Sequence, residues 1–328
     1  MQNHASDALK LVTLKTQNAQ LSLLNFGATT RDWRVSSGDE MVPMILGFED
    51  PKEYLTSQYF FGTIAGRVSN RIGDGRYQTE GGVVELDKNE GATTLHGGSR
   101  SLSLVIWDLS QVSDTQARFE YHSPDGEMGF PGNARIEVLV TLSERQLRYD
   151  MKATVDAVTP ISLAQHNYYN FGGTRDIWDY RIKCPTHSLL EQNDIGVSTG
   201  KVIDTSGGPL DLRNSPTFRQ FEQSGLDCHF IFDDLGNATL REVADIRASD
   251  GKGIKIFSDQ DGAQIYTAHG LPNLSGGLDG ANYGAAAGLC FEPQGYPNAV
   301  NIKEFPSVMA SPEKPYQQTL IIEAVGME

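Results

Sequence analysis

The chain has 328 residues, of which 39% are hydrophobic and 21% are charged, and this composition excludes a disordered or collagen-like protein. Its formal net charge is −15, and a surface this acidic repels phosphate backbones and anionic membranes. We therefore expect neither nucleic acid nor a membrane as a partner, and we attribute the acidity to solubility.

Cysteine usage and the N-terminal stretch bear on the cellular compartment. Cys184, Cys228 and Cys290 are odd in number, widely spaced and without a CxxC pair, which disfavours a disulfide framework and a structural zinc site. The first residues show no basic segment followed by an apolar one, and no apolar run reaches the ~20 residues of a transmembrane helix. We expect a soluble, cytoplasmic protein.

Two segments show weak helical signals. Residues 44–56 (MILGFEDPKEYLT) and 215–223 (SPTFRQFEQ) each have room for about one turn, and neither sustains the 3.6-residue period of an amphipathic helix. We predict short turns in both places.

Alternation of apolar and polar residues is the main signal along the chain. Residues 146–155 read QLRYDMKATV, with apolar side chains at every second position, and residues 134–142 alternate in the same way. A period of two is typical of half-buried strands. Because Ser143 and Glu144 fall between the two runs, the sequence predicts a hairpin here.

Further strand pairs are predicted by the same reasoning. Residues 104–112 and 117–123 read as two adjacent strands. The Asp-Gly pairs at 250–251 and 261–262 each separate two extended runs, and Asp-Gly is a strong hairpin signal because glycine tolerates the positive φ that such turns need. Strands therefore dominate.

We predict an all-β fold, a large antiparallel β-sandwich that forms one domain over residues 1–328. No internal repeat or low-complexity linker is found. The Gly- and Ala-rich stretch 272–288 resembles a linker, and it fits a loop at the rim of a site equally well.

Two segments in the first third of the chain combine polar side chains with glycine. GTIAGRVSNRIGDGRY contains Arg67, Asn70 and Arg71. The planar guanidinium group of arginine has several N–H donors and suits hydroxyl and carbonyl oxygens. A polar turn with solvated arginines is the alternative for an isolated segment of this kind. In TLHGG, His96 precedes two glycines that would allow a ligand to approach the backbone closely. A lone histidine at a strand end is more often structural.

A third segment, LAQHNYYNFGG, places His166 among hydrogen-bonding and aromatic side chains. If the segment is extended, His166, Tyr168 and Asn170 share one face. Aromatic rings beside hydrogen-bonding groups suit a sugar, which has apolar C–H faces and polar edges. A core histidine explains this segment equally well.

A fourth segment, GLCFEPQGYPNAVN, contains Glu292 after three apolar residues and before a proline-rich turn. A carboxylate at the end of an apolar strand is expected to be partly desolvated, which raises its pKa toward that of a general base. The alternative is an exposed glutamate at a strand exit. GLDCHF adds Asp227 and His229 on one strand face. No Walker A, HExxH, GxSxG or GxGxxG motif occurs.

Six strings taken in order, NFGATTRDW, GRVSNRI, LHGG, HNYYNFGG, GLDCHF and FEPQGYPNAVN, resemble the aldose 1-epimerase (galactose mutarotase) family over residues 25–301. The resemblance implies a β-supersandwich. It also implies that His166 is the general acid and Glu292 the general base. The substrate-binding residues that it implies are Arg71, His96, Asp227, Asn70 and Tyr168.

Some positions depart from the family pattern. Asn167 and Phe171 stand where many members have Ser or Thr and Leu, and Cys228 follows Asp227 where many have His. These positions lie where a sugar would be recognised. They leave open which aldose is bound, whether galactose, glucose, arabinose, xylose or an acid sugar.

The activity implied is the interconversion of α and β anomers by acid/base-catalysed ring opening, C1–C2 rotation and reclosure. It needs a carboxylate base and a histidine poised near neutrality as acid, and it needs neither cofactor nor metal. Three alternatives are a non-catalytic carbohydrate-binding protein on the same fold, a mutarotase for a modified or phosphorylated sugar, and a carbohydrate lyase. A phosphorylated sugar would require a basic cluster, whereas the chain has 27 Lys and Arg against 42 Asp and Glu.

Overall fold

The structure is a computed structural model that describes residues 7–171, 175–234, 236 and 239–328. Gly172 and Gly173, which end the HNYYNFGG string, and residues 1–6 lie outside this range. Within it, no helix is long and apolar enough to cross a membrane. The named helical elements are 3₁₀ turns: η1 (Pro51–Leu55), η2 (Gly73–Gly75), η3 (Leu102–Leu104), η4 (Glu127–Gly129), η5 (Leu212–Asn214), η6 (Phe218–Phe221), η7 (Leu278–Gly280) and η8 (Ala299–Asn301). Turns η1 and η6 confirm the two predicted short turns.

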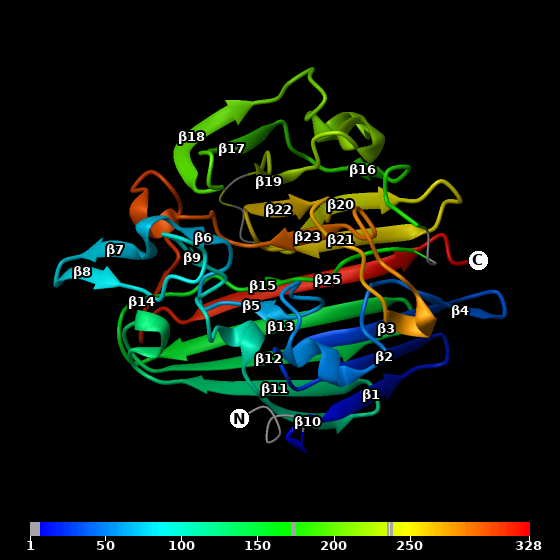
Figure 1. Ribbon diagram of the computed structural model, residues 1–328, viewed down its shortest axis with the longest axis horizontal. Coiled ribbons are helices and arrows are strands. Elements are labelled where there is room, and N and C mark those ends of the chain that lie inside the picture. Colours follow the sequence, from blue (N-terminus) through cyan, green and yellow to red (C-terminus); the bar gives the residue numbers. More distant parts are fainter. Residues whose placement is uncertain (1–6, 172–174, 235, 237–238) are drawn as a thin grey trace.

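The largest sheet has eight antiparallel strands and forms the base of the fold (Figure 1). In spatial order they are β10 (Asp108–Ser113), β11 (Gln116–Ser123), β12 (Ala134–Leu142), β13 (Gln146–Val155), β25 (Tyr316–Val325), β21 (Gly253–Ser258), β20 (Arg241–Arg247) and β16 (Arg181–Lys183). Alternate residues of β12 and β13 are buried, because a strand turns successive side chains to opposite faces.

A four-stranded sheet packs on one part of this base (Figure 1). Its strands are β1 (Leu11–Lys15), β2 (Ala19–Leu24), β3 (Thr29–Ser37) and β4 (Glu40–Pro43). Leu21 and Trp33 belong to the same buried cluster as Val138 and Tyr149 of the large sheet. The Tyr149 hydroxyl also hydrogen-bonds Thr30 Oγ1 at 2.7 Å, so the sheet interface contains a satisfied polar pair.

A five-stranded sheet covers another part of the core and carries the site on its opposite face. Its order is β18 (Ser198–Asp204), β17 (Ser188–Gln192), β19 (Asp227–Ile231), β22 (Gly262–Tyr266) and β23 (Cys290–Pro293). Ile265 and Phe291 lie in the core cluster with Ile256 of the large sheet. Because side chains alternate, Gln264 and Glu292 point to the other face.

Four two-stranded sheets complete the named strands: β5 (Ile64–Ala65) with β15 (Ala164–Gln165), β6 (Arg71–Ile72) with β9 (Thr94–Leu95), β7 (Arg76–Thr79) with β8 (Gly82–Glu85), and β14 (Thr159–Pro160) with β24 (Met309–Ala310). The first pair joins segments about 100 residues apart near the middle of the molecule, beside β23 (Figure 1). The second pair joins segments about 23 residues apart and lies next to β7 and β8 (Figure 1). The observed architecture is the predicted all-β fold of large antiparallel sheets.

The predicted hairpins have two outcomes. Strand pairs β10–β11, β12–β13 and β20–β21 are antiparallel neighbours, as the alternation and the Asp250-Gly251 pair indicate. The hairpin predicted around Asp261-Gly262 is wrong. Strand β21 pairs with β20 and β25, whereas β22 pairs with β19 and β23 in another sheet, so the chain crosses between sheets here.

Candidate active site

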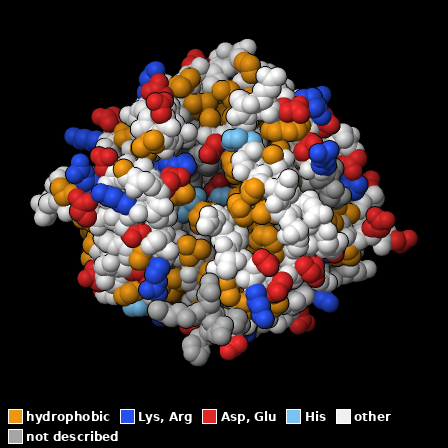
Figure 2. Space-filling view, in the orientation of Figure 1, with side chains coloured by type: hydrophobic (Ala, Val, Ile, Leu, Met, Phe, Trp, Pro, Cys, Tyr) orange, Lys and Arg blue, Asp and Glu red, His pale blue; other side chains and the backbone are white. Residues whose placement is uncertain are grey.

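A cavity of about 300 Å³ opens on the face of the five-stranded sheet, at the lower end of the usual size of ligand pockets. Figure 2 shows the molecule hollowed near the centre of this face, with histidine and acidic side chains in the hollow. The cavity is lined by Gln58, Tyr59, Phe60, Asn70, Arg71, Leu95, His96, His166, Tyr168, Asp227, Gln264, Tyr266, His269, Gly270, Leu271 and Glu292. All seven site residues implied by the resemblance are among them.

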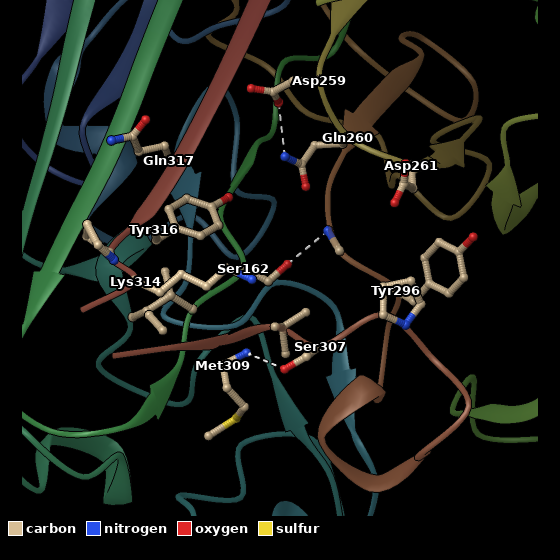
Figure 3. A pocket seen from close by; sticks show the side chains of 16 residues that line it. Ser162, Asp259, Gln260, Asp261, Tyr296, Ser307, Met309, Lys314, Tyr316 and Gln317 are labelled. Atoms are coloured by element: carbon tan, nitrogen blue, oxygen red, sulfur yellow. Dashed lines mark hydrogen bonds between the residues drawn. The ribbon is translucent and has the colours of Figure 1, made fainter. Parts of the chain in front are cut away.

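A second cavity, of about 410 Å³, lies elsewhere and has different chemistry (Figure 3). Tyr296 and Tyr316 line it together with Asp259 and Lys314, and none of the seven residues does. In it, Ser162 Oγ accepts a hydrogen bond from the Gly295 amide at 3.1 Å, and Gln260 Nε2 donates to Asp259 Oδ1 at 3.0 Å. The first cavity is therefore the candidate active site.

His166 and Glu292 face each other in the first cavity, with His166 Nε2 3.7 Å from Glu292 Oε1. His166 follows β15, where its amide donates to Thr63 O and its carbonyl accepts from Gly62 N, each at 2.9 Å. Glu292 lies on β23 directly opposite Gln264 of β22. Backbone pairing therefore holds both side chains in place although they are far apart in sequence.

Burial sets the protonation of this pair. It lowers the pKa of His166 to about 4. It also raises the pKa of Glu292 well above the ordinary value, and the nearby negative charge of Asp227 adds to that rise. Both shifts favour the neutral forms, so burial favours a proton shared by the pair on Glu292. Burial therefore places the pKa of His166 below the near-neutral value expected from the sequence.

Two hydrogen bonds join His96 and Asn70 on one side of the cavity, one between their backbones and one from a backbone amide to the His96 ring. The His96 amide donates to Asn70 O at 3.0 Å, and the Asn70 amide donates to His96 Nδ1 at 3.2 Å. Burial, with the positive charges of a protonated His166 and of Arg71, lowers the pKa of His96 well below its usual value. The ring is therefore neutral, with its proton on Nε2, and it can donate a hydrogen bond.

Arg71 is held by an acidic residue that the sequence analysis did not single out. Glu90 accepts from Arg71 Nε at 2.6 Å and from Nη2 at 2.9 Å. Burial alone would lower the pKa of Arg71, but the Glu90 carboxylate raises it, so the guanidinium stays charged. The N–H of Nε and one N–H of Nη2 are engaged with Glu90, so the second N–H of Nη2 and both N–H groups of Nη1 are not used by this pair.

Asp227 is fixed from the neighbouring strand. Its Oδ1 accepts a hydrogen bond from Gln264 Nε2 at 2.6 Å, and Gln264 in turn lies beside Glu292 across the β22–β23 pair. Tyr168 completes the site, stacking on the His166 ring at a centroid distance of 5.2 Å. The cavity thus combines a buried carboxyl–imidazole pair with ring faces, an imidazole N–H donor, a guanidinium and a second carboxylate.

Comparisons with known proteins identify the family. The aldose 1-epimerase family model matches residues 10–323, nearly the whole chain. The chain belongs to the aldose 1-epimerase family.

Relatives of this epimerase-family chain include galactose mutarotase of Bos taurus, 30% identical, with 93% of this chain and 91% of the relative covered. Aldose 1-epimerase of Escherichia coli K12 is 26% identical, with 90% and 89% covered. Proteins of these names are isomerases.

Solved structures show the same fold. The aldose epimerase homologue from C. elegans has a TM-score of 0.90 at 22% identity, with 96% of this chain and 98% of that chain covered. Galactose 1-epimerase from Lactobacillus acidophilus has a TM-score of 0.84 at 21% identity, with 96% and 94% covered. The supersandwich is therefore the fold of this family member.

Three residues raised as candidates in the sequence lie outside the cavity lining. Arg67 is buried and donates to Ser123 Oγ and to backbone carbonyls of residues 123–132, so it braces a loop. Asn170 donates to Ala287 O at 2.7 Å, so the predicted shared face holds for His166 and Tyr168 alone. His229 is fully buried beside Gln264, its partner across the β19–β22 pair.

The stretch 272–288 of this epimerase-family chain is neither a linker nor part of the lining. Tyr283 is buried, and its hydroxyl donates to Gly47 O at 2.8 Å. The ideal Cβ of an alanine at Gly288 would lie 2.9 Å from Tyr168 Cβ. The stretch therefore packs behind Tyr168 and supports the site from outside.

Sequence reasoning missed Glu90, Gln264 and His269. Gln264 and Tyr266 alternate on β22, and that alternation is the signal that could have placed them on one face. The partner strand β23, which makes this face part of the cavity, was not predictable from a local pattern. Glu90 and His269 carry no local signal.

The two glycines after His96 serve the chain's own packing. At Gly97, φ is +92°, and a Cβ would lie 2.1 Å from Gly66 O. We expect Gly97→Ala to destabilise the protein by at least ~2 kcal/mol, because it combines a strained φ with a backbone clash. Urea unfolding measures this. The matched control is Gly91→Ala, where φ is +60° and nothing lies within 4 Å; equal losses at both positions would refute the packing argument.

Proposed function

We propose that the chain is an aldose 1-epimerase that interconverts the α and β anomers of a free aldose such as galactose or glucose. The observation that carries the proposal is the buried His166–Glu292 pair, 3.7 Å apart in a cavity ringed by sugar-binding types of side chain. The sequence similarity to galactose mutarotase and aldose 1-epimerase supports the same reaction.

Ring opening requires one group to take the proton of the C1 hydroxyl and another to give a proton to the ring oxygen. In our proposal Glu292 is the base and a protonated His166 the acid. The C1–O5 bond breaks, an aldehyde forms, and rotation about C1–C2 exposes its other face. The reverse transfers then close the ring as the opposite anomer. Each positioned transfer contributes on the order of 10²–10⁴ in rate.

Burial fits this use of the pair. When the ring opens, the proton count of the pair is unchanged: protonated His166 and ionised Glu292 become neutral His166 and protonated Glu292. The shifts in both pKa values favour this neutral state, which accompanies the open-chain aldehyde. The ionised state accompanies the cyclic sugar, whose hydroxyl groups replace water as hydrogen-bonding partners.

The remaining groups suit a neutral sugar. His96 offers an N–H, Arg71 its Nη1 and Asp227 a carboxylate for hydroxyl groups or the ring oxygen. Within the described residues, Arg71 is the one Lys or Arg in the lining, and Glu90 already neutralises it. A phosphate would lack a basic cluster, so a free aldose is favoured over a sugar phosphate.

A shared proton predicts a broad pH profile. The pair gains a second proton when the pH falls through the lowered pKa of His166, about 4, and loses its last one when the pH passes the raised pKa of Glu292. We measure the rate of mutarotation by polarimetry, with a chelator present to remove metal ions. We expect this rate to be nearly constant between about pH 5 and pH 6.5 and to fall below that range. An independent histidine acid of ordinary pKa would instead lose activity as the pH rises through ~6.5.

The same polarimetric assay tests the function itself. Freshly dissolved α-D-galactose or α-D-glucose should reach its equilibrium rotation faster with the protein than without it. Saturable sugar binding with no such acceleration would instead identify a carbohydrate-binding protein on this fold.

A further inference from the structure

A third reactive side chain lies beside the His166–Glu292 pair. Cys290 Sγ is 3.6 Å from His166 Nδ1, and Cys290 is a free, fully buried thiol. It precedes Glu292 by two residues on β23, and this spacing puts both side chains on the same face of the strand. A ring nitrogen of His166, the Cys290 Sγ and a carboxylate oxygen of Glu292 all lie within 4.8 Å of one another.

These three side chains form a ligand set for a particular kind of metal. Thiolate, imidazole nitrogen and carboxylate oxygen bind Zn²⁺ at about 2.3, 2.0 and 2.1 Å, and tetrahedral coordination then separates the ligand atoms by about 3.5 Å. Cys290 Sγ lies 3.6 Å from His166 Nδ1, whereas Glu292 Oε1 lies 3.7 Å from His166 Nε2. Because the two distances involve different ring nitrogens, side-chain movements of about 1 Å are needed to bring the three ligands around one ion. Mg²⁺ and Ca²⁺ prefer oxygen ligands alone and fit poorly.

The charge of the set also suits a divalent ion. A thiolate and a carboxylate together carry two negative charges, which Zn²⁺ cancels, so a loaded site would be neutral as a whole. Burial opposes isolated charges and does not oppose a compensated cluster. With three protein ligands the fourth tetrahedral position is left for a water molecule.

We propose that His166, Cys290 and Glu292 form an inhibitory Zn²⁺ site at the wall of the active-site cavity, which His166 and Glu292 line and behind which Cys290 is buried. The metal site stands on the geometry of the three side chains, and its inhibitory consequence rests on the proposed function. A bound ion would engage the acid and the base at once and would compete with the sugar for the cavity. The reaction itself needs no metal, so Zn²⁺ would act as a regulator.

Metal binding is tested without any activity measurement. Chelator-treated protein is titrated with Zn²⁺ by calorimetry and with Co²⁺ by absorption spectroscopy, where a thiolate ligand gives a charge-transfer band. We expect one ion per chain and a charge-transfer band. Cys290→Ser should abolish the band and weaken Zn²⁺ binding by about 10-fold or more. The matched control, Cys228→Ala on β19 of the same sheet, should keep both. Far-UV circular dichroism checks folding.

Two results would overturn the metal site. One is that the wild type does not bind Zn²⁺. The other is that the Co²⁺ band persists in both Cys290→Ser and Cys290→Ala and vanishes in Cys228→Ala. Inhibition is measured separately by polarimetry, where saturating Zn²⁺ should reduce the rate to that of the uncatalysed reaction. A Cys290-dependent band in a protein without mutarotation would support the metal site and count against the proposed function alone. Mutarotation unaffected by bound Zn²⁺ would overturn the inhibitory role.

Discussion

Replacing Glu292 by Gln is expected to lower the rate of catalysed anomer exchange by about 10²–10⁴-fold while leaving the protein folded. The amide cannot take up the proton of the C1 hydroxyl. It does resemble the neutral acid that burial already favours at this position, so the folding cost is small. Polarimetry measures the rate, and urea unfolding measures the stability.

Glu40→Gln provides the matched control, since Glu40 is exposed on β4 and does not line the cavity. It makes the same chemical change and should retain the full rate. Full activity in the Glu292→Gln variant would remove Glu292 from the mechanism, whatever its pKa.

Replacing His166 by Asn is the second substitution with a large expected effect, a loss of about 10²–10⁴-fold, because the ring oxygen would lose its proton donor. The backbone bonds to Gly62 and Thr63 do not depend on the side chain, so the loop should keep its place. His122→Asn, at an exposed position outside the lining, is the control.

The two substitutions are also informative together. Residues that act as one unit lose most of their effect when either is removed, so the double variant should be little slower than each single variant. Independent losses that multiply in the double variant would contradict a shared proton. Imidazole added to the His166→Asn protein should restore part of the rate, since the vacated space opens on the cavity.

The fold was predictable wherever a local pattern and a local partner coincide. Strands β12 and β13 are neighbours in sequence and in space, and their alternating residues determine both their faces and their pairing. The Asp261-Gly262 prediction failed for the opposite reason. Gly262 does not adopt the positive φ of such a turn and is the first residue of β22. The partners of β22 come from residues 227–231 and 290–293, and no local signal contains that information.

The site shows the same division. The residues next to His166 and Glu292 in the sequence made each a candidate site residue. That the two act as a pair was implied by the family resemblance. Their protonation was predicted in part: desolvation of Glu292 follows from an apolar strand, whereas that of His166 depends on Tyr168 and other residues packed around it. Glu90 and Gln264 act through contacts across strands, and no local sequence pattern identifies such contacts.

The central claim is that this pocket catalyses anomer exchange, and one measurement addresses it most directly. Polarimetry of freshly dissolved α-D-galactose and α-D-glucose compares the wild-type chain with its Glu292→Gln variant. The account predicts faster approach to the equilibrium rotation with the wild type and a rate near the uncatalysed one with the variant. Saturable sugar binding by calorimetry, with neither sugar mutarotating faster in the presence of the wild type, would contradict it.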